Sequence, residues 1–238
     1  DSKSLALLDN LDVAAIKVGS GELTNTPFLQ EIAEQGRPMI VSTGMSTMDE
    51  VESAVEAIRE ASTDVPLALL HCVSLYPADI DLVNLRAMQA MADRFDTPIG
   101  FSDHTTQVET PGLAVAMGAT IVEKHLTLDH SLPGPDHEAS LEPEEFDRSV
   151  DIIRNSERTK GSPEKRPVGD EMNTAFIARK SLHVTAHLKA GATLIADHIE
   201  ITRPANGLPP SRYEDVVGQR LSESLAAGDP ITEDILVE

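Results

Sequence analysis

The sequence has few aromatic residues, no tryptophan and one cysteine. Aromatic side chains make up 3% of the 238 residues. A hydrophobic core therefore has to be built from Val, Ile, Leu, Ala and Met, and the hydrophobic fraction of 40% is sufficient for one. Since Cys72 stands alone, an intramolecular disulfide is excluded, and a reducing cytoplasm is the expected compartment.

Basic side chains are also scarce. Acidic residues outnumber basic ones by 40 to 19, which gives a formal net charge of -21 at pH 7. This charge argues against nucleic acid and anionic membranes as partners. No apolar run is long enough to cross a bilayer, and Asp1–Ser4 does not begin like a signal peptide. An acidic surface suits high salt, so a halophilic source is one interpretation and an acidic mesophilic protein is the other.

Short apolar runs alternate with helical patterns through the first two thirds of the chain. Strands are expected at residues 13–20, 38–42, 66–74, 98–102 and 120–125. This alternation is typical of βαβ units in an α/β fold with a parallel sheet. Polar residues follow every strand, which favours a (β/α)8 TIM barrel over a doubly wound sheet. Only about five units are present, whereas a whole barrel takes about 250 residues, so three units are expected to be missing from the front.

Two histidines stand at matching places in successive units. The carboxyl ends of parallel strands meet at one edge of a sheet, so Ser102, His104, Lys124 and His125 are expected to lie close together there. His104 and His125 could then hold a divalent metal between them. Either histidine alone could instead be a hydrogen-bonding residue at the end of its strand, and it is the matched pair that favours the metal.

The last third of the chain has a different composition. Residues 159–170 are polar and rich in Gly and Pro, which indicates a linker. We place the five barrel units at 1–158, the linker at 159–178 and a small, mostly β domain at 179–238. Residues 188–197 are echoed by residues 225–234, which predicts an internal pseudo-repeat in that domain.

A set of motifs runs in one order through the chain. They are Lys17–Asn25 (KVGSGELTN), Ser42–Met45 (STGM), Leu70–Pro77 (LHCVSLYP), Phe101–His104 (FSDH), Glu123–Asp129 (EKHLTLD) and Gly134–His137 (GPDH). Together they resemble the sialic acid synthase (N-acetylneuraminate synthase) family. The tail resembles that family's antifreeze-like SAF domain, in which an Arg-Pro-x-Asn-Gly loop corresponds to Arg203–Gly207.

This resemblance implies a reaction and a cofactor. Phosphoenolpyruvate would condense with the aldehyde of an N-acetylated hexosamine, such as N-acetylmannosamine, to give a nine-carbon 2-keto sugar acid and phosphate. A divalent metal, Mn²⁺ or Mg²⁺, would bind His104 and His125, and imidazole favours Mn²⁺. The resemblance also implies a domain-swapped homodimer, in which Arg203 reaches the sugar in the partner subunit. An exposed loop cation is the alternative for Arg203.

The resemblance also assigns roles to individual residues. The catalytic residues would be His104, His125 and Asp136, and the substrate-binding residues would be Lys17, Ser20, Ser42, Ser74, Tyr76, Ser102 and Arg203. Hydroxyls and an ammonium suit a phosphate and a carboxylate. Each serine alone could be a helix or turn cap, and Asp136 could be a loop acid. Glu123 has the strand parity of His125, so it could also point inward.

The chain departs from the family pattern in two places. Members of the family begin with about three more βα units, which carry an acid, a phosphate-binding lysine and amides that hold the sugar. The alternative is therefore a truncated, non-catalytic fragment whose SAF domain binds carbohydrate or mediates dimerisation. Ser74 stands where many members that accept N-acetylmannosamine carry Asn, which leaves open a precursor of legionaminic acid or of spore-coat sugars. A metal hydrolase is disfavoured because only two histidine ligands are evident.

Overall fold

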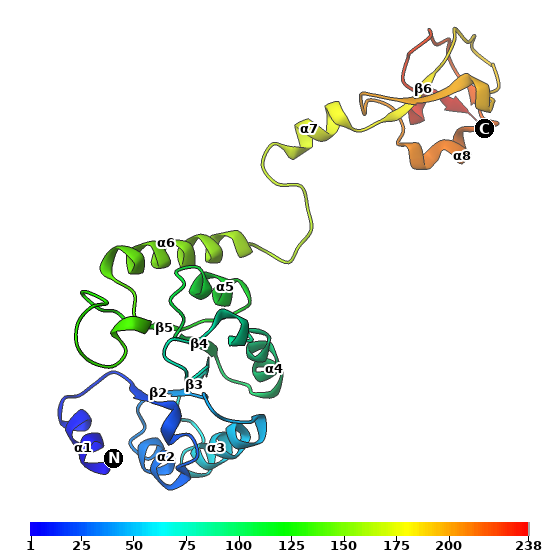
Figure 1. The fold of residues 1–238 in the computed structure, drawn as a ribbon. Coiled ribbons are helices and arrows are strands. Elements are labelled where there is room, and N and C mark those ends of the chain that lie inside the picture. Colours follow the sequence, from blue (N-terminus) through cyan, green and yellow to red (C-terminus); the bar gives the residue numbers. More distant parts are fainter. Residues whose placement is uncertain (238) are drawn as a thin grey trace. The chain divides into compact units, whose positions relative to one another are not determined.

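The chain forms two compact units, Asp1–Gly161 and Ser162–Glu238 (Figure 1). The computed structural model describes residues 1–237. Helix α6 extends to Lys160, and helix α7 spans Glu171–Ala178, so both lie partly or wholly within the linker placed at 159–178.

The first unit contains five successive βα units. Its strands are β1 (Ile16–Val18), β2 (Met39–Ser42), β3 (Leu67–Cys72), β4 (Ile99–Asp103) and β5 (Val122–Lys124). Its helices are α1 (Ser2–Asn10), α2 (Thr26–Ala33), α3 (Met48–Ala61), α4 (Arg86–Arg94), α5 (Thr110–Ala116) and α6 (Pro143–Lys160). Helix α1 was not expected from the sequence.

The five strands are parallel, and their order in the sheet is the order in the chain. A sheet that grows in one direction through right-handed crossovers places all of its helices on the same face. This arrangement matches part of a (β/α)8 barrel, because a doubly wound sheet would reverse its strand order at a switch point. The expected fold class is therefore confirmed.

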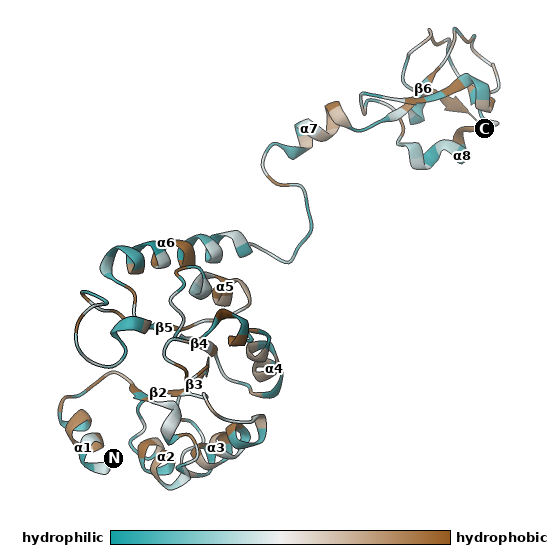
Figure 2. Ribbon diagram, viewed as in Figure 1, coloured by the Kyte–Doolittle hydropathy of each residue, from teal (hydrophilic) through white to brown (hydrophobic). Residues whose placement is uncertain are grey.

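Strand alternation gives the two faces of the sheet different roles. One face packs against residues of the helices in the main hydrophobic core, and its side chains include Ile16, Met39, Leu69 and Phe101. The brown colour of strands β2 to β4 in Figure 2 marks their hydrophobic residues. The opposite face carries polar side chains toward the carboxyl ends of the strands. In the register of the sheet, Cys72 pairs with Ser102, and Ser102 in turn pairs with Glu123. The alternation thus lines up the polar residues in rows across one face.

Helix α3 begins with a capping box. The Thr47 side chain accepts a hydrogen bond from Glu50 N at 3.3 Å, and the Glu50 carboxylate accepts one from Thr47 N at 2.7 Å. Two amide groups that the helix itself cannot pair are satisfied in this way. The cap fixes where the loop after β2 turns into the helix, and that loop carries part of the site.

The second unit is small and rich in loops. It contains α7 (Glu171–Ala178), β6 (Ser181–Val184), β7 (Ile199–Thr202), α8 (Tyr213–Val216), β8 (Arg220–Leu221) and β9 (Leu236–Val237). Strands β6 and β7 form one antiparallel pair, and β8 and β9 form another. A core that includes Leu182, Leu194, Val216 and Ile231 holds the pieces together.

The internal repeat predicted for this unit is present in the structure. Leu188 and Leu225 exchange both of their backbone hydrogen bonds, each at 2.9 Å. Three residues later, Gly191 and Gly228 adopt φ values of +82° and +87°, which favour glycine because it has no Cβ. The two copies are thus equivalent turns that pair with each other.

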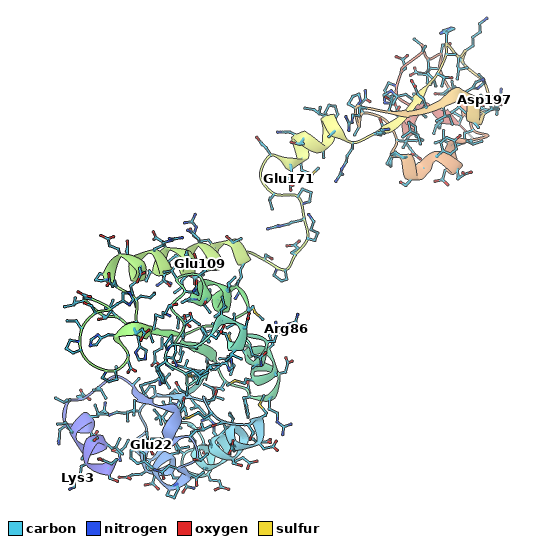
Figure 3. All side chains as sticks on the ribbon, in the orientation of Figure 1. Lys3, Glu22, Arg86, Glu109, Glu171 and Asp197 are labelled. Atoms are coloured by element: carbon cyan, nitrogen blue, oxygen red, sulfur yellow. The ribbon has the colours of Figure 1, made fainter. Side chains whose placement is uncertain are left out.

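Exposed charged side chains are present on both units. Figure 3 labels Arg86 and Glu109 in the first unit and Asp197 in the second, and all three are exposed. No helix within residues 1–237 is both long and apolar enough to span a membrane.

Candidate functional site

The carboxyl ends of the strands bring nine of the predicted site residues into one connected group. The first part of the group lies around β1 and β2. Lys17 Nζ donates to Ser42 Oγ at 2.8 Å, and Ser20 Oγ accepts a hydrogen bond from Gly44 N at 3.0 Å. A Cβ built on Gly44 would lie 2.2 Å from Ser74 Oγ, so Ser74 also lies against this loop. One ammonium group and several hydroxyls therefore meet at one place.

The second part of the group is an aromatic cluster at the ends of β3, β4 and β5. The ring centroids of His104 and His125 are 5.1 Å apart. Tyr76 lies beside both imidazoles, at 4.1 Å from His104 and 5.7 Å from His125. Asp136 Oδ2 is 4.0 Å from His125 Nδ1. The two histidines are thus neighbours, with a phenol and a carboxylate close to them.

Glu123 and Ser102 connect the two parts. Ser102 Oγ donates to Glu123 Oε1 at 2.7 Å, and Glu123 Oε2 lies 3.4 Å from Lys17 Nζ. The sequence-based expectation that Glu123 points inward is confirmed. The Glu123 carboxylate partly neutralises the charge of Lys17 and helps to hold its ammonium group at the carboxyl end of the sheet.

Cys72 lies at the centre of the group, and the sequence analysis did not assign it a role. Its Sγ is 3.7 Å from His104 Nδ1 and 4.0 Å from Ser74 Oγ. Burial alone would raise the pKa of the Cys72 thiol, but contact with His104 and the hydroxyls of Ser20 and Ser102 outweighs burial and lowers it. The alternation of side chains along β3 could have indicated this position. His71 points to the same face as Phe101, so Cys72 points to the face that carries Ser102.

The two imidazoles have different electrostatic surroundings. Burial disfavours the charged form of His104, yet hydrogen bonds to Cys72 and to the Val73 carbonyl outweigh it and raise the pKa of His104. Burial and the nearby charge of His104 lower the pKa of His125. The His125 imidazole therefore stays neutral more readily, which leaves a nitrogen lone pair free to bind a cation.

The orientation of the His104 ring is fixed by a hydrogen bond to the backbone carbonyl of Val73. Its Nδ1 lies 2.8 Å from the Val73 carbonyl oxygen, so this nitrogen must carry the proton and donate it. Nε2 is then the nitrogen that could bind a metal, as is common when the other ring nitrogen is hydrogen-bonded to a carbonyl. Within residues 1–237, no group of three or more His, Cys, Asp or Glu side chains could hold a metal. Any cation on the histidine pair would need further ligands from water or substrate.

Lys124 lies at the same edge of the sheet, at the end of β5, but its side chain does not join the group. The expectation that it lies close to the two histidines on the site's face is wrong. Its side chain has the opposite strand parity to that of His125, so it points toward the helices. There Lys124 Nζ pairs with Asp103 Oδ2 at 2.9 Å. Burial lowers the pKa of Lys124, and the Asp103 charge opposes this effect.

Arg203 lies in the second unit, in the loop after β7. Its Nε donates to the Ala178 carbonyl oxygen at 2.8 Å, so the residue is anchored to the end of α7. Its side chain is exposed. The contacts described for Arg203 all lie within its own unit, and its role toward the sugar stays a prediction.

Comparison with known proteins identifies both parts of the chain. Residues 1–165 match the NeuB family and residues 179–237 match the SAF domain. An N,N'-diacetyllegionaminic acid synthase from Legionella pneumophila is 44% identical over 96% of this chain and 65% of its own length. The human N-acetylneuraminate-9-phosphate synthase is 34% identical over 99% of the chain and 66% of its own length. The chain thus spans about two thirds of the length of these two relatives.

The fold has counterparts among solved structures. A spore coat polysaccharide biosynthesis protein E from Chromobacterium violaceum superposes with a TM-score of 0.81, at 25% identity, over 100% of this chain and 72% of its own. The family match covers more than half of the chain, and the relatives cover nearly all of it. The chain therefore belongs to the NeuB family and carries a SAF domain after its half-barrel.

Proposed function

We propose that this chain is part of an enzyme that condenses phosphoenolpyruvate with the open-chain aldehyde of an N-acetylated hexosamine. The products are a nine-carbon 2-keto sugar acid and phosphate. The observation that carries the proposal is the pair of imidazoles 5.1 Å apart, beside an ammonium and several hydroxyls at the same edge of the sheet. The names of the relatives, which are synthases of sialic-type sugar acids, support the same class of reaction.

Lys17 and the hydroxyl groups are suited to hold phosphoenolpyruvate. Its phosphate and carboxylate need charged or hydroxyl donors, and a protein with a net charge of -21 offers few cations elsewhere. Lys17 Nζ and Ser42 Oγ are already paired at 2.8 Å, and the hydroxyls of Ser20 and Ser74 converge on Gly44. When the anion binds, these side chains would exchange their present hydrogen bonds for bonds to the anion, and the backbone would not have to move.

The histidine pair fits a divalent cation. Two imidazoles that bind one ion at about 2.1 Å have ring centroids roughly 4.5 to 6.5 Å apart, depending on the angle between them. The observed 5.1 Å lies in this range, and His104 presents Nε2 because Nδ1 is used by Val73. We infer that Mn²⁺ is preferred to Mg²⁺, since imidazole is a poor ligand for Mg²⁺. When bound, the cation would polarise the aldehyde oxygen.

The bond changes follow from the substrates. The enol carbon C3 of phosphoenolpyruvate bonds to the aldehyde carbon, and the aldehyde oxygen takes a proton. Water then adds to the positive charge left at C2, and the loss of phosphate from C2 leaves a ketone. Asp136, whose Oδ2 is 4.0 Å from His125 Nδ1, would accept hydrogen bonds from the sugar hydroxyls, and Tyr76 lies beside both imidazoles.

The sugar is expected to carry two acetamido groups. The relative at 44% identity is named for an N,N'-diacetyl product, and Ser74 is smaller than the Asn that the family resemblance associates with N-acetylmannosamine. A shorter side chain leaves more room beside the aromatic cluster. A sugar with one acetamido group is the alternative.

Replacement of the histidines tests the proposal. In the full-length protein that contains this chain, His104→Ala and His125→Ala should each abolish phosphate release and raise the Kd for Mn²⁺ by at least about tenfold, measured by calorimetry. His187→Ala, an exposed histidine of the second unit, is the matched control and should change neither. Unchanged Mn²⁺ affinity in both site variants would refute the metal assignment.

A further inference from the structure

A buried ion pair lies directly behind the two histidines. Lys124 Nζ is 2.9 Å from Asp103 Oδ2, and the two side chains are 4% and 0% exposed. The two residues are partners in the pairing of β4 with β5. Asp103 immediately precedes His104, and Lys124 immediately precedes His125. The pair therefore joins the backbones that carry the two imidazoles, on the face of the sheet opposite to them.

Thr105 extends this link to the other side of His104. The Asp103 carboxylate accepts hydrogen bonds from Thr105 N at 2.9 Å and from Thr105 Oγ1 at 3.2 Å. Lys124 Nζ also donates to the Thr105 carbonyl oxygen. The residues before and after His104 are thus bonded to each other and to the residue before His125.

The pair has little value as a source of stability alone. Desolvating two charges costs about as much as their attraction returns, and well-packed apolar residues often replace a buried pair without loss. Within residues 1–237, Asp103 is the only acidic residue among the buried ones. A buried pair is better suited to fixing a register than to adding stability, and this pair fixes the register of β4 and β5 where both histidines emerge.

We propose that Asp103 and Lys124 are positioning residues, which hold the imidazoles of His104 and His125 at the separation at which they share one divalent cation. Neither residue touches substrate or cation. The inference rests on the proposed function, because it assumes that the histidine pair binds the metal. Residues that hydrogen-bond to metal ligands typically change metal affinity 10- to 100-fold when they are replaced, and this pair acts on the same two ligands through their backbones.

The test compares Asp103→Asn, Lys124→Met and the double variant in the full-length protein. The double variant matters most, because it leaves no unpaired buried charge and so should keep its fold, which circular dichroism would check. Glu52→Gln, which breaks the exposed pair between Glu52 and Arg94, is the control. Calorimetry gives the Kd for Mn²⁺. In metal-free protein, mass spectrometry gives the rate at which diethyl pyrocarbonate modifies His104, which is 5% exposed.

The folded double variant should bind Mn²⁺ at least about tenfold more weakly than wild type, and its His104 should be modified faster, while the control changes neither. Wild-type values of both quantities in that variant would overturn the inference and leave the proposed function intact. If the wild-type protein itself bound no Mn²⁺, the metal assignment would fall, and the modification rate alone would decide whether the pair positions His104. Failure of every variant to fold would assign the pair to folding and overturn its positioning role.

Discussion

Gly44 shows at the scale of a single residue how the absence of a side chain shapes the site. A Cβ at this position would lie 2.2 Å from Ser74 Oγ and 2.8 Å from Ser20 Oγ. Both distances are far shorter than a van der Waals contact. The two hydroxyls can therefore occupy these positions only because residue 44 has no Cβ. The obstructing atoms are the ends of small side chains, which can rotate away, and are not backbone atoms.

This geometry predicts the effect of Gly44→Ala. The hydroxyls of Ser20 and Ser74 should rotate away from the new methyl group, so the protein should fold but lose hydrogen bonds to a charged ligand. Such bonds contribute about 1.5–3 kcal/mol each, so the KM for phosphoenolpyruvate should rise tenfold or more. Gly21→Ala, where the new Cβ would meet no atom within 4 Å, is the control. An unchanged KM in the folded Gly44 variant would remove these hydroxyls from the anion site.

Single residues also show what the sequence could predict. Most of the cluster was predictable, because polar residues at the ends of parallel strands converge on one edge. Lys124 was misplaced because the prediction counted its proximity in sequence to His125 and ignored the alternation of side chains along a strand. Cys72 was missed because a lone cysteine in an apolar strand has the same pattern as an ordinary core residue.

At the scale of elements, β4 organises the first unit. All five of its residues are buried, and it pairs with β3 on one side and β5 on the other. Its alternation sends Phe101 and Asp103 toward the helices and Ser102 toward the site. The strands were predictable from their apolar runs. Four of them are shorter than expected because the ends of the runs form loops, whereas β4 has the expected length and begins and ends one residue later. Helix α1 was not predicted, since only Leu5 within it is buried and its apolar pattern is weak.

Phe101→Ala tests the importance of β4 for the core. The ring is 1% exposed and stacks on His71, with centroids 6.1 Å apart. Its loss should lower the free energy of unfolding by about 3–5 kcal/mol, measured by urea denaturation of the full-length protein. Leu113→Ala on α5, where the side chain is 53% exposed, should change it by less than about 0.5 kcal/mol. A similar small loss for both variants would show that the core is not centred on this strand.

At the scale of the whole molecule, a half-barrel and a SAF domain are joined by a segment that contains α7. The composition indicated the change of domain near residue 159, but helix α7 was not predicted, because the surrounding Gly and Pro residues suggested a linker. Catalytic turnover should be measured on the full-length protein, because this chain spans 65% of the length of the Legionella relative.

Complementation between subunits tests the role of Arg203. We propose that the loop after β7 reaches the site of a partner subunit in a homodimer. Arg203→Ala should then raise the KM for the sugar far more than that for phosphoenolpyruvate. A mixture of Arg203→Ala and His125→Ala subunits should regain activity, because one of the two sites in each mixed dimer has both residues intact. Verified mixed dimers without activity would show that Arg203 acts within its own subunit or has no catalytic role.

The most direct test of the central claim is product analysis with the full-length protein, phosphoenolpyruvate, Mn²⁺ and a panel of N-acetylated hexosamines. Our account predicts phosphate release only when a sugar and the metal are both present. Mass spectrometry should show an equal amount of a 2-keto acid with three more carbons than the sugar. Sugars with two acetamido groups should have the highest kcat/KM. Phosphate release at the same rate without any sugar, or without such a product, would contradict the proposed condensation.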